Sequence, residues 1–571
     1  MSVEKTTRIA QKTTSQELKS NHLWRSETGE MVDSLDEAMR FLVEKRNLVC
    51  VEGKIEEKNY EESFFNSSDI PDFNRAIEKV FKAKEEKTRV AIFGDYDVDG
   101  ITSSAILKEA LEKLGVNTKV YLPHREDDGY GLNDPFVKKI SKTADLLIAI
   151  DNGTSAHKEI ELAKKLGLDV VVIDHHEVKE TLPDALIVNP HRTDSTYPFK
   201  ELCAAGLAFK FAREIYVRLG CEDDAKWLLD LAALGTVADR VTLKSENRAI
   251  VYYGLKVLAV TRRKGLISLI MRSGLLGKKI NAEELAFKII PRLNAAGRMQ
   301  HADLAFNLII SSDNLEAEKL SAQLDLLNNE RKKITESAVK EIKENLLRTM
   351  PLPEVICASG NWPVGILGIL AGKIADDLRR PTAIVNLNER TCTGSIRGNG
   401  GDSVVDMLAS FGHVFSKFGG HHEAGGFSFA MEDFPLVDKF FRDFQLSENI
   451  TTSTIFYDFE ISPEIVGADF LALINQFEPY GEGNTRPVFL LRNLVVDDLR
   501  ALGATKNHRR FILSHENLPA QVTAIAFHWN NRQLPDIGSR VDLLAELRLN
   551  DFRGNVSVDL HVRDIQTSVS I

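Results

Sequence analysis

Apolar runs alternate with helical patterns of hydrophobic positions from about Lys87 to Asp239. The apolar runs are short, rich in Val, Ile or Leu, and bounded by polar or glycine residues: Thr88 to Phe93, Leu146 to Ile150 and Val170 to Ile173. Such runs are typical of strands covered on both faces. The helical patterns include Thr102 to Leu114 and His157 to Leu166. This alternation predicts a parallel, doubly wound sheet.

The pattern changes three times further along the chain. Leucine and isoleucine recur at helical spacing from Asn314 to Thr349, which predicts a helix about 50 Å long, able to brace two domains. Strand and helix patterns return between about Pro353 and Leu446. Beyond Thr451 short strands predominate, and Val556 to Arg563 alternates strictly between apolar and polar residues. Several such strands over about 90 residues predict a small closed barrel.

Length and composition fit an intracellular enzyme with several domains. A chain of 571 residues is too long for one ordinary core and predicts three or four domains. Its five cysteines are scattered without a C-x-x-C pair, which favours neither a disulfide framework nor a zinc knuckle. The polar start, Met1 to Ser20, contains no apolar signal region, and no apolar run is long enough to cross a bilayer. We therefore expect a cytoplasmic protein without a membrane association.

Two motifs after predicted strands indicate a metal site. The first is Gly94-Asp-Tyr-Asp-Val-Asp-Gly100 and the second is Asp174-His175-His176. If the chain stays extended through the first motif, Asp95, Asp97 and Asp99 point to one side. Carboxylate oxygens combined with imidazole nitrogen suit Mn²⁺ better than Mg²⁺ or Zn²⁺. The alternative for the first motif is an ordinary solvated turn, because Asp and Gly are common turn residues.

Two further segments favour the metal site over the turn. The predicted strand ending at Ile150 runs into Asp151-Asn152-Gly153. The apolar helical pattern from Leu228 to Val237 is followed by Asp239. In four separate segments an apolar element is thus followed by an acidic residue or a histidine. These are positions where this fold places ligands.

The ordered set GDYDVDG, DNG, DHH and GTVAD resembles the DHH phosphoesterase superfamily. Within that superfamily the chain is similar to the RecJ family of single-strand-specific 5′-to-3′ exonucleases. The resemblance extends over roughly Arg89 to Ile565 through PHREDDGYGLN, PRLNAAGR, WPVGILGI, KFGGHHEAGG and ELRLNDFRGN. It departs from the family pattern at Pro363, where a histidine is common, and at Gly398, where a serine often follows the arginine.

The resemblance implies a centre with two metal ions. Asp151 is expected to bridge two Mn²⁺ ions, with Mg²⁺ as an alternative, and Asp95 is either a ligand or a residue that orients the ligands. The remaining ligands implied are Asp97, Asp99, His175 and Asp239. His176 is expected to contact the scissile phosphate.

It also implies a path for the substrate. Arg125, Arg292 and Arg298 are expected to bind phosphate together with Asn294, although structural ion pairs are the alternative for the arginines. Ser395 and Arg397 correspond to a pocket for a 5′-terminal phosphate. The glycine-rich segment with Gly420 and His421 lets the backbone approach phosphate closely.

The domain layout follows from pattern and resemblance together. We expect an α/β fold with two α/β domains joined by a long helix, plus a C-terminal all-β OB-fold barrel. The expected parts are an N-terminal extension packing on the DHH core (1–85), the DHH domain (86–312), the helix (313–350), the DHHA1 domain (351–446) and the OB-fold (451–571).

The barrel is expected to bind single-stranded DNA. OB-folds combine basic grooves with aromatic stacking, and Lys506, His508, Arg509 and Arg510 form a basic cluster. The stacking candidates, for which a core position is the alternative, are Phe511, Phe527, His528 and Trp529. The net charge of −11 argues mildly against a nucleic-acid partner, but the carboxylates of a metal site contribute to it and bound cations offset them.

The sequence therefore predicts a Mn²⁺-dependent exonuclease that digests single-stranded DNA from the 5′ end to 5′-mononucleotides, in recombination and repair. We expect a monomer that works with a single-strand-binding protein and a helicase. Two alternatives stay open. One is a DHH phosphodiesterase for cyclic dinucleotides or short RNA oligomers, and the other is a non-catalytic DNA-binding scaffold.

Overall fold

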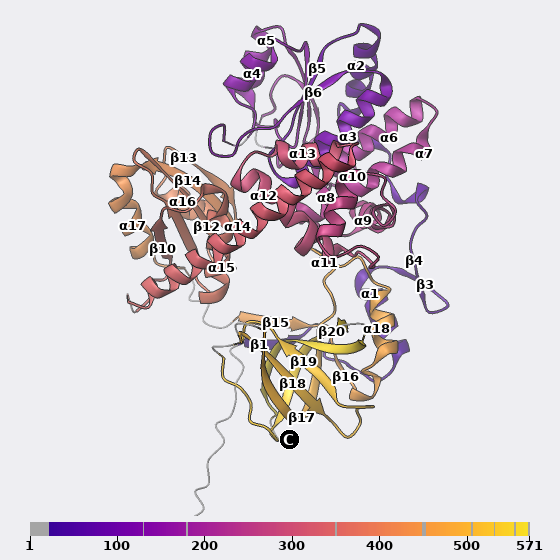
Figure 1. Cartoon of the computed structure of the whole chain (residues 1–571), viewed down its shortest axis with the longest axis vertical. Coiled ribbons are helices and arrows are strands. Elements are labelled where there is room, and N and C mark those ends of the chain that lie inside the picture. The colour runs from indigo at the N-terminus through magenta and orange to yellow at the C-terminus, as the bar shows by residue number, and fades with distance from the viewer. Residues whose placement is uncertain are drawn as a thin grey trace, which may run out of the picture. The chain divides into compact units, whose positions relative to one another are not determined.

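The computed structural model describes residues 22–129, 131–178, 181–348, 351–447, 453–503, 506–529, 532–552 and 555–568. The chain divides into two compact units (Figure 1). The described residues of Lys58–Asn449 and Pro479–Asn484 form the α/β unit, which contains both α/β domains. The described residues of Met1–Glu57, Ile450–Glu478 and Thr485–Ile571 form the barrel unit. Among the described residues no helix is long and apolar enough to cross a membrane.

A five-stranded parallel sheet forms the first α/β domain. Its order is β6 (Thr118–Tyr121), β5 (Val90–Phe93), β7 (Leu146–Ile150), β8 (Asp169–Ile173) and β9 (Leu186–Val188). Because β5 lies between β6 and β7, the chain leaves it first toward one edge and later toward the other. The doubly wound sheet is confirmed, and its topological switch point lies between β5 and β7.

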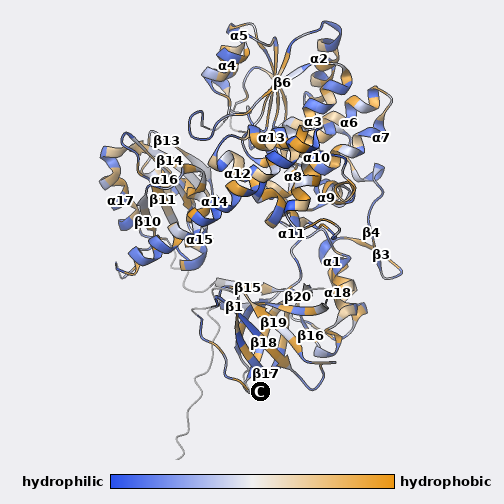
Figure 2. Ribbon diagram, in the orientation of Figure 1, coloured by the Kyte–Doolittle hydropathy of each residue, from blue (hydrophilic) through white to orange (hydrophobic). Residues whose placement is uncertain are grey.

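Each face of this sheet has its own hydrophobic core. Ile92 and Ile148 pack on the side of α2 (Phe73–Glu85), α3 (Val98–Leu114) and α6 (Ala204–Arg218). Phe93 and Ala149 pack on the side of α4 (Asp134–Ile140) and α5 (His157–Lys165). Alternate residues of one strand thus enter opposite cores, as the period of two requires. In Figure 2 the helices show both hydrophilic and hydrophobic colours, as expected of elements with one buried face.

Helices complete the first α/β domain. They are α7 (Glu222–Ala225), α8 (Leu229–Ala238), α9 (Ser245–Leu258), α10 (Lys264–Arg272), α11 (Ala282–Glu284), η4 (Leu285–Ile289), α12 (Ile290–Met299) and α13 (Asp303–Ile310). The predicted long helix is confirmed as α14 (Asn314–Leu346), which has 33 residues. It packs against α10, α12 and α13 and also against α15 (Leu367–Leu378) of the second α/β domain. The helix therefore braces the two domains of the α/β unit.

The second α/β domain contains a mixed sheet. Its order is β10 (Ile356–Gly360), β11 (Thr382–Asn386), β12 (Thr391–Arg397), β14 (Ala424–Ala430) and β13 (Lys417–His421). Only the β10 and β11 pair is parallel. Its helices are α15 (Leu367–Leu378), α16 (Val404–Ser410) and α17 (Phe434–Asp443).

The barrel unit contains the predicted closed barrel. Five strands follow one another around it, and the last pairs again with the first: β17 (Phe489–Leu502), β18 (His508–Ser514), β19 (Val522–Ala526), β21 (Asn555–Thr567) and β20 (Arg540–Phe552). Closure leaves no free edge in the barrel itself.

The start of the described chain belongs to the barrel unit, which differs from our expectation that residues 1–85 pack on the DHH core. Strand β1 (His22–Ser26) pairs with β15 (Ser453–Tyr457), and β2 (Met31–Val32) pairs with β16 (Phe459–Ile461). Helix α1 (Leu35–Arg46) contacts α18 (Ala468–Asn475), and β3 (Val49–Val51) pairs with β4 (Lys54–Glu56). Only the part from Lys58 onward, which includes α2, joins the α/β unit. Residues 1–21 lie outside the described residues.

Candidate metal centre

The first aspartate motif begins a helix rather than continuing a strand, so the predicted extended geometry is wrong. Asp97 caps α3, its Oδ1 accepting the Gly100 N–H at 3.1 Å, and Asp99 lies in the first turn. The helix can start this early because Gly100 has no side chain: a Cβ there would lie 2.6 Å from the backbone N and O of Asp95. The carboxylates therefore converge by a tight turn.

Asp99 is fixed by the start of a second helix. Its side chain is buried, and its two oxygens accept the N–H groups of Ala204 and Ala205, each at 2.8 Å. These amides belong to the first turn of α6, where unpaired N–H groups favour a negative charge. The carboxylate is thus held in a defined orientation toward the other ligands.

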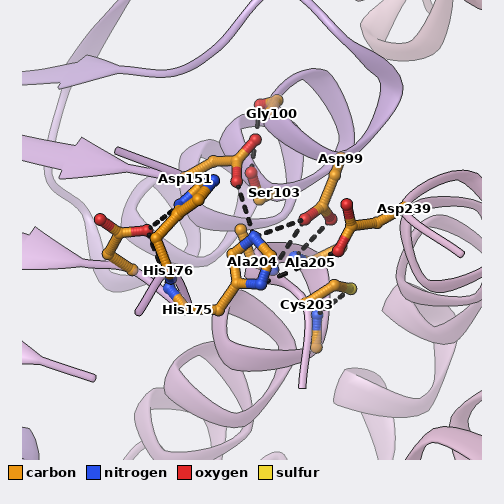
Figure 3. A network of polar contacts seen from close by, with 12 residues as sticks. Asp99, Gly100, Ser103, Asp151, His175, His176, Cys203, Ala204, Ala205 and Asp239 are labelled. Atoms are coloured by element: carbon orange, nitrogen blue, oxygen red, sulfur yellow. Dashed lines mark hydrogen bonds and ion pairs between the residues drawn. The ribbon is translucent and has the colours of Figure 1, made fainter. Parts of the chain in front are cut away.

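His175 lies among three carboxylates (Figure 3). Its Nε2 is 3.2 Å from Asp151 Oδ1 and 3.9 Å from Asp99 Oδ2. Its Nδ1 is 3.8 Å from Oδ2 of Asp239, the residue that ends α8. Asp151 follows β7 in the left-handed conformation, with φ of 64°. Loops after β5, β7 and β8 and the end of α8 therefore meet at the switch point of the sheet.

The potential ligands form overlapping groups whose ligand atoms lie within 4.8 Å of one another. Asp95, Asp97 and Asp151 form one group, and Asp99, His175 and Asp239 form another. Asp151 also groups with His175 and His176. All six predicted ligands are thus brought together, with Asp151 in the first group and next to His175 of the second.

The electrostatics of the cluster fit bound cations. Burial, followed by the charge of Asp97, raises the pKa of Asp95 to about 8 and that of Asp99 to about 7. Burial and the neighbouring carboxylates raise the pKa of Asp239 to about 8 and that of Asp151 well above its usual range. Oδ1 of Asp95 is buried and has no hydrogen-bond partner among the described residues. Crowded carboxylates with an unpaired oxygen are a donor set that divalent cations complete.

The two histidines differ in charge. Burial and the neighbouring His176 lower the pKa of His175 to about 4, so the ring is neutral and can ligate a metal. Burial alone would lower the pKa of His176, but the hydrogen bond from its Nδ1 to Asp174 Oδ1, 2.7 Å long, raises that pKa to about 9. A cationic ring beside the carboxylate cluster is suited to a phosphate.

Our sequence reasoning gave Asp174 no role. The carboxylate is buried and accepts the N–H groups of Thr154, His175 and His176 as well as the His176 ring. Burial opposes its charge, but these hydrogen bonds and the neighbouring imidazoles hold its pKa below the usual value. Its place directly before the two histidines was the available signal.

Two predicted phosphate-binding arginines lie beside a cavity. Arg125 stacks on Tyr96, with the guanidinium carbon 3.9 Å from the ring centre, and its buried Nε has no hydrogen-bond partner in the described part of the chain. Burial and the charges of Arg125 and Arg331 lower the pKa of Arg298 to about 10, and Arg298 donates to the Gly365 carbonyl at 2.9 Å. Both line a cavity of about 670 Å³ together with residues of the second α/β domain. Neither forms an ion pair with a described residue.

Arg292 and Asn294 have structural partners. Arg292 Nε donates to Asp325 on α14 at 2.8 Å, and its Nη1 donates to the Lys288 carbonyl at 2.6 Å. This ion pair is the alternative that the sequence left open. Asn294 Oδ1 accepts the Val98 N–H at 3.2 Å and so supports the start of α3. Phosphate contacts by these two residues stay a prediction.

Ser395 and Arg397 lie on β12 of the second α/β domain. Arg397 Nη1 donates to Ser395 Oγ at 3.2 Å and to the Ile396 carbonyl at 3.0 Å. Burial lowers the pKa of Arg397, and Gly368 of α15 leaves room for its guanidinium. A half-buried arginine with no carboxylate among its described partners is suited to a terminal phosphate. No described hydrogen bond or ion pair links it to the carboxylate cluster.

Gly420 and His421 lie on the exposed edge strand β13. Gly420 has φ of 152°, and a Cβ there would collide with the Ala424 carbonyl oxygen, so the position requires glycine. A contact of either residue with phosphate stays a prediction.

Comparison with known proteins identifies the family. The model of the DHH family, N-terminal domain, matches residues 89–236, and that of the RecJ OB domain matches residues 457–564. The single-stranded-DNA-specific exonuclease RecJ of Haemophilus influenzae is 33% identical over 531 residues, which cover 88% of this chain and 92% of that protein. The chain belongs to the RecJ family.

Other RecJ proteins extend the comparison. RecJ of Bacillus subtilis is 34% identical over 519 residues, but this chain spans only 64% of that longer relative. The crystal structure of Thermus thermophilus RecJ in complex with Mn²⁺ has a TM-score of 0.75 at 27% identity, covering 88% of this chain and 72% of that one. The same RecJ was also solved with Mg²⁺. The carboxylate and imidazole donors found here fit either ion.

The structure of the RecJ-type barrel shows which of the aromatic candidates are buried and which are exposed. Phe511 and Trp529 are buried, so for them the alternative of a core position holds. Phe527 is 46% exposed, and its ring meets the rings of His508 and His561 edge-on at 5.2 and 5.1 Å. His528 in turn contacts His508. The exposed ring lies beside the strand that carries Arg509 and Arg510.

Proposed function

We propose that this chain is a single-stranded-DNA-specific exonuclease that hydrolyses DNA from the 5′ end and releases 5′-mononucleotides. The observation that carries the proposal is the overlap of two ligand groups at Asp151, because two-metal hydrolysis needs a carboxylate shared by both ions. Membership of the RecJ family supports it, since the relatives bear the name single-stranded-DNA-specific exonuclease.

In this proposal the residues divide between two metal positions. Asp95 and Asp97 would hold one ion, Asp99, His175 and Asp239 would hold the other, and Asp151 would be the carboxylate shared by both. When bound, the two cations supply charge stabilisation for the phosphate and activation of the attacking water. The fixed amide contacts of Asp99 keep its oxygens in place for this role.

The cationic side chains then orient the DNA. His176, held protonated by Asp174, lies next to the ligands and places a positive charge beside the scissile phosphate. Arg125 and Arg298 supply further positive charge at the neighbouring cavity. Arg397 and Ser395 accept the 5′-terminal phosphate. In this proposal the 5′-to-3′ polarity arises because a strand whose 5′ end lies in this pocket presents its first phosphodiester bond to the metal centre.

The cellular setting is proposed from the same resemblance. We propose a cytoplasmic monomer that acts in recombination and repair on strands supplied by a helicase and coated by a single-strand-binding protein. Discrimination against duplex DNA is assigned to the path between the two domains of the α/β unit.

A single assay tests the proposal. Single-stranded DNA labelled at either end is incubated with Mn²⁺ and with wild type, Asp151→Ala or Asp184→Ala. Asp184 is a matched control because it is a highly exposed carboxylate that pairs with Lys164 outside the cluster. We expect wild type and Asp184→Ala to release labelled mononucleotide at once from the 5′-labelled strand and to give a ladder of shortening products from the 3′-labelled strand. We expect no turnover by Asp151→Ala.

The same assay addresses the alternatives. If only cyclic di-AMP, offered in parallel, were cleaved, the phosphodiesterase function would replace this proposal. Tight DNA binding without any Mn²⁺-dependent cleavage would instead support the scaffold.

A further inference from the structure

A six-residue turn from the C-terminal part of the sequence packs as part of the α/β unit. Pro479–Asn484 lies between two segments of the barrel unit in sequence, yet it groups with Lys58–Asn449. Gly481 and Asn484 pair with each other through two backbone hydrogen bonds of 3.0 and 3.2 Å, and the buried Asn484 side chain donates to the Pro479 carbonyl at 2.8 Å. These bonds make the turn compact and self-supporting.

The turn docks on the segment that follows Asp239. The Leu243 N–H donates to the Glu482 carbonyl at 2.7 Å. A Cβ on Gly481 would lie 2.6 Å from Leu243 Cδ1, and a Cβ on Gly483 would collide with Thr242 Oγ1 and lie 3.1 Å from Thr242 Cβ. The backbone of the turn therefore approaches residues 242–243 as closely as the absence of side chains allows.

This segment leads directly to the proposed metal ligand. Arg240, the first residue after Asp239, has φ of 59°, a left-handed conformation that surrounding contacts must hold in place. Leu243 is buried and belongs to a small core in which Val237, two residues before Asp239, also packs. The Thr242 carbonyl accepts from the buried Asn247 side chain at 3.0 Å. The end of α8 is thus fixed partly by the residues that the turn contacts.

We propose that the turn Pro479–Asn484 is a positioning element for Asp239, and that its two glycines set the metal affinity of the centre without touching metal or DNA. The inference rests on the proposed role of Asp239 as a metal ligand. Residues that orient ligands in this way typically change metal affinity 10- to 100-fold when altered.

The test compares two glycines of the same backbone conformation. Gly483 has φ of +68° and is crowded by Thr242, whereas Gly538 in the barrel unit has φ of +84° with no atom within 4 Å of a Cβ. Alanine at either position carries the same left-handed strain, but only Gly483→Ala displaces residues 242–243. Mn²⁺ binding to the full chain is measured by calorimetry, and exonuclease turnover is measured as a function of Mn²⁺.

We expect Gly483→Ala to bind Mn²⁺ about tenfold more weakly and to recover turnover at high Mn²⁺, while Gly538→Ala matches wild type. Adding Thr242→Ala to Gly483→Ala removes the colliding hydroxyl and should restore part of the affinity. If Gly483→Ala does not fold, Gly481→Ala is used, because a Cβ at that position contacts only the side chain of Leu243. Its expected effect is smaller and in the same direction.

The outcomes separate the two proposals. Equal Mn²⁺ affinity of folded Gly483→Ala and Gly538→Ala overturns the positioning role, as does a loss of turnover that Mn²⁺ does not restore. A wild-type chain that binds no Mn²⁺ would instead overturn the proposed metal centre itself.

Discussion

At the residue scale, the raised carboxylate pKa values predict a dependence of stability on pH. Asp95, Asp99 and Asp239 hold protons in the metal-free folded state up to about pH 7 to 8, whereas the unfolded chain releases them near pH 4. The folded state therefore binds more protons between these limits, and its free energy of unfolding falls as pH rises. His176, whose pKa is raised to about 9, adds to the fall above pH 6.5.

Mn²⁺ should reverse this trend, because it binds the ionised ligands. We expect the melting temperature of the metal-free protein to fall from pH 6.5 to pH 8, and the increase caused by Mn²⁺ to be larger at pH 8. Asp95→Asn, which removes one of the repelling charges, should reduce the fall. Scanning calorimetry with and without chelator measures each quantity, and a metal-free melting temperature that rises with pH would contradict the argument.

Arg397 is predicted to set the preference for phosphorylated ends. Replacing it with alanine removes the guanidinium that faces Ser395, so the advantage of a 5′-phosphorylated over a 5′-hydroxyl strand should fall by about tenfold, mainly in KM. Steady-state kinetics on the two substrates measure this ratio. Arg390→Ala, at an exposed position next to β12, serves as the control. An unchanged ratio in Arg397→Ala would place the 5′ phosphate elsewhere.

At the element scale, the exposed ring on the barrel is expected to stack with a base. Phe527→Ala should weaken the binding of a single strand by about tenfold, whereas Phe527→Trp should retain it, because base stacking contributes about 1 to 3 kcal/mol. Fluorescence anisotropy with a labelled oligonucleotide, in chelator to prevent cleavage, measures the affinity. Leu549→Ala, an exposed apolar residue of β20, is the matched control. Equal affinities of Phe527→Ala and Leu549→Ala would remove stacking from the barrel's role.

How well each feature could be predicted depended on whether it is formed by the local sequence or by contacts that form only in the folded chain. The strands β5, β7 and β8 lie within two residues of their predicted bounds, because a fully apolar run needs a partner on both faces wherever it lies. The early start of α3 was missed, since it depends on how closely Gly100 packs against Asp95. Motif order predicted which ligands meet, but not the hydrogen bonds of Asp174, which form only when the loops after β7 and β8 come together.

At the scale of the whole molecule, the barrel unit is built from both ends of the chain. Strand β2 has only two residues, and its partner β16 lies more than 400 positions later. The pairing therefore could not be predicted from a local pattern. Leu42 and Ala38 of α1 are fully buried, and Phe41 meets Phe459 edge-on at 5.1 Å. Residues 22–57 are therefore structural parts of this unit rather than a detachable extension.

This architecture predicts where a distant core substitution acts. Leu42→Ala removes a fully buried side chain from α1 and should lower the free energy of unfolding of the barrel unit by about 2 to 5 kcal/mol. The α/β unit has its own cores, so its unfolding transition and its Mn²⁺ affinity should stay unchanged. Urea unfolding is followed by tryptophan fluorescence, in which Trp24, which donates to Asp564, reports on the barrel unit, and Mn²⁺ binding is measured alongside to report on the α/β unit. Arg40→Ala, an exposed position on the same helix, is the control. A loss of Mn²⁺ affinity in Leu42→Ala would mean that α1 supports the metal centre. That result is expected of an extension that packs on the DHH core.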